Sequence, residues 1–112
     1  MKRIKVVVSG NIQNVGYRAK VIGIAKTFGL TGSVQNLDDG RVKIIAEGED
    51  SNLDRFLDAI RIKNTLINVH DVEVERADAT GDFAEFYKLV GGGETDERLD
   101  KASEYLKAVI VL

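Results

Sequence analysis

The chain has 112 residues, of which 44% are hydrophobic and 30% are charged, a composition typical of one soluble globular domain rather than of a disordered chain. It has no cysteine and one histidine, which excludes disulfides, thiolate zinc sites and cysteine nucleophiles and makes a Ser-His-Asp triad or a multi-histidine metal site hard to build. The net charge of −2 hides an excess of basic residues up to residue 45 and of acidic residues after it. The first half can therefore attract an anion, unless folding mixes the two halves in space.

The first half of the chain predicts one helix and three strands. Alternating apolar residues predict a strand over residues 3–8, and apolar residues at helix spacing predict a helix over residues 17–28 that stops at Gly29. Two strands at residues 30–36 and 41–47 follow, because the Asp-Gly pair between them is a strong hairpin signal.

The second half predicts two more helices and two more strands. Ser51 is placed to cap the second helix of the chain, and strands follow at residues 69–77 and 84–90. The three glycines at 91–93 are interpreted as a hinge before a third amphipathic helix that begins near Thr95. The apolar stripe of the second helix recurs at i, i+3, i+4 and i+7: Leu53, Phe56, Leu57 and Ile60.

The order of these elements is β-α-β-β-α-β-β, followed by a helix. The first six form the split βαβ pattern of the ferredoxin-like α+β fold, in which two helices cover one face of an antiparallel sheet. We therefore expect a domain over residues 1–90, with residues 91–112 forming the hinge and a helix that packs on the same domain or on a second copy. The apolar face of the sheet should carry Ile4, Val6, Val8, Val42, Ile44, Val72 and Val74.

The segment between the first strand and the first helix, residues 10–16, is rich in glycine and asparagine. A loop that permits unusual backbone angles just before a helix can turn successive N–H groups inward, and such a nest binds phosphate or carboxylate. Arg18 stands at the helix start, where its forked guanidinium can close over the same anion. The segment matches neither the nucleotide P-loop nor the dinucleotide G-x-G-x-x-G motif. These residues alone leave two readings, an anion cradle or a structural loop with a solvated arginine.

Here the sequence resembles the acylphosphatase family. The first family signature is G-x-V-Q-G-V-x-F-R, and residues 10–18 read GNIQNVGYR. The second is roughly G-W-V-x-N followed closely by D-G and V, and residues 32–36 read GSVQN before DGRV at 39–42. The resemblance covers about residues 3–90, and both motifs occur at the expected spacing on the expected fold.

The resemblance implies an enzyme that hydrolyses the carboxyl-phosphate bond of acyl phosphates to a carboxylate and inorganic phosphate. Arg18 matches the arginine that binds the phosphate, and Asn36 matches the asparagine that positions the attacking water. No metal or cofactor is implied. The backbone amides that would bind the phosphate of the substrate are those of Gln13, Asn14, Val15, Gly16, Tyr17 and Arg18.

Elementary chemistry agrees with this reading. A carboxylate is a good leaving group, so the reaction needs positioning and charge stabilisation more than a strong general acid. Asn14 departs from the family pattern, which has glycine there, and we expect it to adopt a positive φ because asparagine tolerates that conformation best after glycine. Without the arginine motif, Asn36 would be interpreted as a turn-capping residue.

Two alternatives belong to other functional classes. A non-catalytic anion or small-molecule binding module on the same fold is motivated by Asn14 and by residues 91–112, for which the family pattern does not account. An RNA-binding domain needs exposed aromatic residues on the central strands, and residues 5–9 and 42–46 have none, so we expect no nucleic-acid partner.

Location and assembly are inferred from hydropathy and from the predicted C-terminal helix. No apolar run approaches the roughly 18 residues of a membrane span, and the run at residues 6–8 is too short for a signal peptide. We therefore expect a cytoplasmic protein with no membrane partner. It should be a monomer, or a homodimer formed through the C-terminal helix, and its natural substrate is left open.

Overall fold

The computed structural model describes residues 1–90, in which the helices and strands follow the predicted order. The elements are β1 (Lys2–Asn11), α1 (Tyr17–Thr27), β2 (Thr31–Asn36), β3 (Val42–Gly48), α2 (Asp50–Ala59), β4 (Asn68–Asp78) and β5 (Phe86–Leu89). The third helix expected from Thr95 lies outside the described residues. No helix within residues 1–90 has the length and apolar character needed to cross a membrane.

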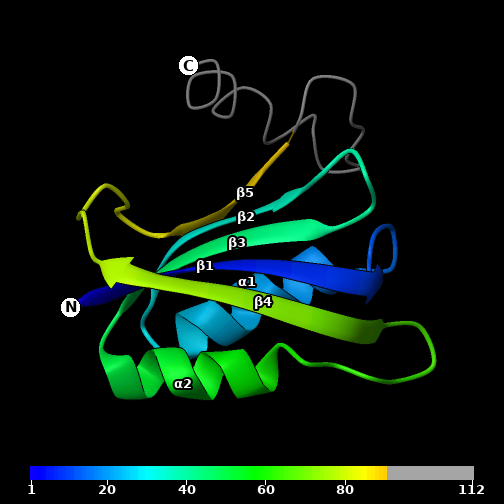
Figure 1. Cartoon of the computed structure of the whole chain (residues 1–112), viewed down its shortest axis with the longest axis horizontal. Coiled ribbons are helices and arrows are strands. Elements are labelled where there is room, and N and C mark those ends of the chain that lie inside the picture. Colours follow the sequence, from blue (N-terminus) through cyan, green and yellow to red (C-terminus); the bar gives the residue numbers. More distant parts are fainter. Residues whose placement is uncertain (91–112) are drawn as a thin grey trace.

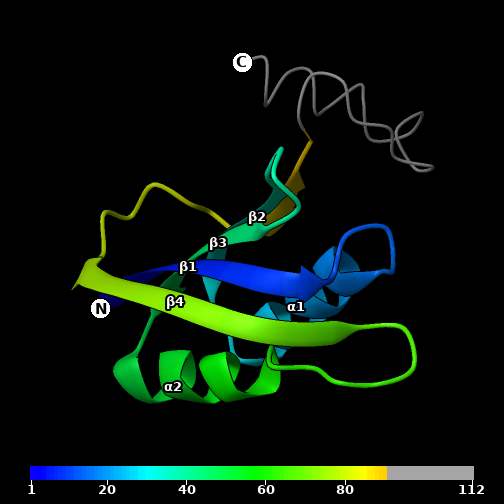
Figure 2. The same ribbon diagram turned by 45° about the vertical axis from the view of Figure 1, so that its right-hand side comes forward.

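The five strands form one sheet in the order β4-β1-β3-β2-β5. β5 runs parallel to β2, and the other neighbouring strands are antiparallel. Figures 1 and 2 show α1 and α2 side by side on one face of this sheet, and no helix of residues 1–90 covers the other face. The predicted ferredoxin-like α+β fold is thus confirmed for the described part of the chain.

The core lies between the sheet and the two helices, as the alternating pattern predicts. Ile4, Val6 and Val8 of β1 are fully buried, whereas Lys5 between them is exposed on the other side of the strand. The predicted apolar stripe of α2 is buried in the same core. Its Phe56 packs against Phe86 of β5 with 6.1 Å between ring centroids. Burial of these apolar faces is the main force that holds the helices on the sheet.

Two local expectations are wrong. Ser51 lies inside α2, and the residue before the helix is Glu49, which is extended and makes no side-chain capping bond. β3 runs to Gly48, so only one residue is left to turn into the helix, and Asp50 supplies the favourable negative charge of the first turn. Val74 does not join the core and is 36% exposed, whereas Val72 of the same edge strand, β4, packs against it.

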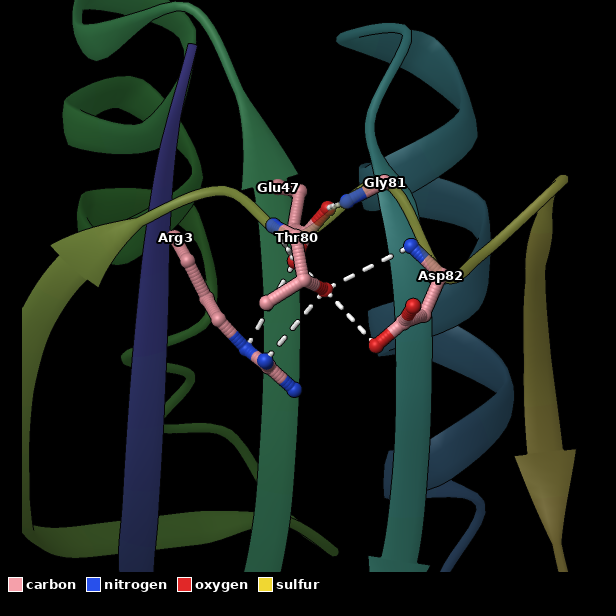
Figure 3. Close-up of polar contacts among 5 residues, drawn as sticks. All are labelled: Arg3, Glu47, Thr80, Gly81 and Asp82. Carbon is pink, nitrogen blue, oxygen red and sulfur yellow. Dashed lines mark hydrogen bonds and ion pairs between the residues drawn. The ribbon is translucent and has the colours of Figure 1, made fainter.

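A buried carboxylate anchors the connection between the edge strands β4 and β5 (Figure 3). Glu47 of β3 is 4% exposed, and its oxygens accept hydrogen bonds of 3.0 Å from the backbone N–H groups of Thr80 and Gly81. The Thr80 hydroxyl lies 3.0 Å from Glu47 Oε2 and 2.9 Å from Asp82 Oδ2, and Arg3 Nε is 3.6 Å from the Glu47 carboxylate. Burial raises the pKa of Glu47, but these donors and the arginine outweigh it and hold the pKa below its usual value.

Candidate active site

The predicted cradle begins where β1 leaves its regular pairing with β4. The register between these strands shifts between Ser9 and Gly10, and Gly10 has a φ of 142°. A Cβ atom on Gly10 would collide with the backbone oxygen of Asn68 in β4. Glycine is therefore required here, because it lets β1 approach β4 closely before the chain turns away into the loop.

Apolar side chains anchor the loop to the hydrophobic core. Ile12 and Tyr17 are each 1% exposed, and Val15 packs against the same core. The Tyr17 hydroxyl donates a 2.8 Å hydrogen bond to the carbonyl of Ile60, just beyond the end of α2. Burial raises the pKa of this hydroxyl, so it stays protonated as a donor. The side chain of Tyr17 is thus a core anchor, and only its backbone amide is left for the role predicted at this position.

The backbone of the loop is left-handed at two positions. Asn14 has a φ of 64°, and Gly16, the residue before α1, has a φ of 83° and a ψ of 10°. The expectation that Asn14 adopts a positive φ is confirmed. Left-handed residues of this kind occur in backbone nests, and the following helix adds the positive end of its dipole. Gly16 has no side chain to cap the first N–H groups of α1, and α1 has no acidic residue in its first turn.

Arg18 and Asn36 lie at the same end of the sheet but come from separate elements. Arg18 is in the first turn of α1, and Asn36 is the last residue of β2. Across the sheet, Val42 of β3 pairs with Val8 on one side and with Asn36 on the other. Nη1 of Arg18 and Oδ1 of Asn36 are both buried, so these polar ends point into the protein rather than into bulk solvent.

The side chain of Gln13 joins the loop to the β2–β3 turn. Its Nε2 atom donates hydrogen bonds to the carbonyl oxygens of Leu37, at 2.8 Å, and of Arg41, at 2.9 Å. The sequence assigned only a backbone role to Gln13. No local pattern could have shown this bridge, because its partners lie 24 and 28 residues further along the chain.

Asp39 shapes the same turn, as expected of a turn former. Its carboxylate accepts a 3.1 Å bond from the backbone N–H of Arg41 and a 2.8 Å bond from the guanidinium of that residue. The backbone bond above all, aided by the guanidinium, holds the pKa of Asp39 below its usual value. Among residues 1–90, no group of three His, Asp or Glu side chains is arranged to hold a metal ion, and His70 is exposed on β4.

A shallow groove of about 340 Å³ lies on the sheet face opposite α1 and α2. Its lining mixes both charges with apolar residues and contains no aromatic ring, so it lacks the stacking surface that RNA recognition would use. The residues that line it are Lys5, Val7, Leu37, Arg41, Lys43, Glu73, Val74 and Glu75.

Comparison with known proteins identifies the family of this chain. The family model named acylphosphatase matches residues 4–88. An acylphosphatase of Methylococcus capsulatus is 43% identical over 89 residues, which is 80% of this chain and 97% of the relative, and one of Archaeoglobus fulgidus is 44% identical over 78 residues, 70% of this chain and 88% of the relative. The crystal structure of acylphosphatase from Bacillus subtilis superimposes with a TM-score of 0.75 at 33% identity, covering 79% of this chain and 98% of that one. The chain therefore belongs to the acylphosphatase family.

Proposed function

We propose that this chain hydrolyses acyl phosphates by holding the phosphate in the loop before α1 and the attacking water on Asn36. The observation that carries the proposal is the junction of loop and turn. The Gln13 side chain joins the left-handed loop to the turn that directly follows Asn36. Arg18 lies in the first turn of the helix that follows this loop. This arrangement occurs at the two signature segments of a family whose members are acylphosphatases.

Binding uses the positive charge at the start of α1. The backbone amides of residues 13–18 donate to the equatorial oxygens of the phosphoryl group, and the guanidinium of Arg18 adds a forked, charge-assisted contact. Charge on these oxygens is spread in the transition state, so preorganised donors stabilise it without any rearrangement. The arginine and the helix dipole supply the positive charge, and we expect the reaction to need no added divalent metal.

The chemical step is an in-line displacement at phosphorus. Asn36 offers a side-chain acceptor and donor that orient one water molecule toward the phosphorus atom. The bond from the water oxygen to phosphorus forms while the bond from phosphorus to the carboxyl oxygen breaks, and the carboxylate leaves with that electron pair. The proton of the water passes to a phosphoryl oxygen, so no separate general base takes part.

The direct test is hydrolysis of benzoyl phosphate at neutral pH in the presence of a chelator. We expect turnover that the chelator leaves unchanged and that inorganic phosphate inhibits competitively. Lys20→Ala is the matched control for Arg18→Ala, because Lys20 is an exposed cation on the same helix, and only the Arg18 variant should lose activity. Phosphate binding without hydrolysis of any acyl phosphate would instead support the non-catalytic binding module.

A further inference from the structure

We propose, resting on the function proposed above, that the side chain of Gln13 is a positioning residue that sets where Asn36 holds the water. Gln13 is half-buried between the loop and the β2–β3 turn. Its amide nitrogen carries two hydrogens, and the structure gives each of them one carbonyl oxygen. The backbone amide of Gln13 remains available to the phosphate, so the residue has two separable roles.

The two bonds of Gln13 complete the closure of the turn. Leu37 N–H donates to the carbonyl of Arg41 at 2.8 Å, and Gly40 N–H donates to the carbonyl of Leu37 at 3.2 Å. Each carbonyl that Gln13 contacts therefore already accepts one backbone bond, and Gln13 fills its second acceptor position. Backbone hydrogen bonds within the turn hold it closed, and the Gln13 side chain connects it to the loop.

This bridge matters because the sheet joins the two halves of the site only indirectly, through β3. β3 lies between β1 and β2, which places those strands roughly 10 Å apart, twice the usual strand spacing. Asn36 is the last residue of β2 and the next residue begins the turn, so its position depends on how the turn is held. An error of about 1 Å in the position of a reacting group costs roughly 10²-fold in rate.

Gln13→Met tests the bridge, because methionine has similar length and no charge but cannot donate a hydrogen bond. Gln35→Met is the matched control, since Gln35 is a half-buried glutamine on β2 beside Asn36 and outside the proposed site. We expect Gln13→Met to lower kcat by roughly ten- to a hundredfold while the Ki of inorganic phosphate changes by less than about threefold. The Gln35 variant should change neither value by more than about threefold. Unchanged kcat in Gln13→Met, or a phosphate Ki that rises as much as kcat falls, would overturn the proposal.

A double-mutant cycle with Asn36→Ala separates positioning from general stabilisation. If Gln13 acts through Asn36, then Gln13→Met should cost less than about threefold in kcat once Asn36 is alanine. The same fold loss in both backgrounds would mean that Gln13 acts elsewhere. Assays are done well below the melting temperature of each variant, so a loss of stability alone leaves kcat unchanged and counts against the proposal.

A readout without catalysis distinguishes failure of the bridge from failure of the proposed function. We expect amide hydrogen exchange of Leu37 and Gly40 to speed up at least tenfold in Gln13→Met and to stay unchanged in Gln35→Met. Unchanged exchange would overturn the bridge whatever the activity. If the wild-type chain hydrolyses no acyl phosphate while exchange responds as expected, the proposed function fails and the bridge stands as a structural device only.

Discussion

At the scale of residues, Arg18 and Asn36 of the proposed site differ in the groups that they can offer a substrate. Arg18 brings a permanent positive charge in a planar fork, whereas Asn36 brings a neutral donor and acceptor at a strand end. Substitutions at the two positions should therefore affect different kinetic constants.

We expect Arg18→Lys to raise the Ki of inorganic phosphate by about ten- to a hundredfold and to lower kcat, because lysine keeps the charge but loses the forked contact. Asn36→Ala should lower kcat by about 10²-fold and leave the phosphate Ki within about threefold of wild type. Steady-state kinetics with phosphate as inhibitor, on variants shown to be folded, measures both. The water-positioning role is wrong if Asn36→Ala weakens phosphate binding and spares kcat.

Asn14 invites a test of the loop backbone. Because its φ is 64°, an alanine there is strained, and we expect Asn14→Ala to lower the free energy of unfolding by about 1 kcal/mol. Asn14→Gly should match or exceed wild-type stability and keep activity, since glycine adopts this conformation without steric cost. Urea denaturation of the three proteins makes the comparison. Equal stability of the alanine and glycine variants would remove the argument from strain.

At the scale of elements, the sequence predicts the bounds of a helix or strand well where a local pattern sets them. It predicts them less well where pairing with a distant strand sets them. The sequence predicts that α1 ends at residue 28, and it ends at Thr27. The agreement is close because the stop signal, Gly29, is local. β1 was expected to end at residue 8 but continues to Asn11, since it resumes pairing with β4 beyond the irregularity at Gly10. The motif loop and Asn36 could be proposed as site residues from the sequence, but the bridge between them requires knowing that two distant segments meet.

The connection between β4 and β5, to which the sequence assigns no role, is held by the buried carboxylate of Glu47. Glu47→Gln replaces one acceptor oxygen by an NH₂ group that faces backbone N–H donors. We therefore expect the free energy of unfolding to fall by about 1–3 kcal/mol at pH 7. Because the folded pKa of Glu47 lies below the unfolded value, its contribution is complete above the unfolded pKa and is lost as the pH falls through the folded one. The difference in free energy of unfolding between wild type and Glu47→Gln should therefore become smaller below about pH 4.

Urea unfolding at pH 7 and at pH 3 checks this expectation. Glu73→Gln is the control, because Glu73 is exposed on β4, and its effect should stay within about 0.5 kcal/mol. A gap of the same size at both pH values would show that the charge of Glu47 is not what anchors the connection.

At the scale of the whole molecule, we propose that residues 1–90 form the catalytic domain and that residues 91–112 are not required for catalysis. The matched family model ends at residue 88, and both signature segments lie upstream. We expect a chain truncated after Val90 to keep kcat/KM within about threefold of the full chain, although its melting temperature or oligomeric state can change. A truncated protein that is folded but inactive would show that the last residues complete the site.

The parallel pairing of β5 with β2 has a consequence during synthesis. Within residues 1–90, the outer side of β2, the strand that ends in Asn36, pairs with β5, residues 86–89. A nascent chain that has left the ribosome only as far as the end of β4 can pair four strands, but β2 is then an edge with open hydrogen-bonding groups. Until the last strand of the domain emerges, the strand that carries Asn36 is a second open edge, besides β4, at which another chain can pair.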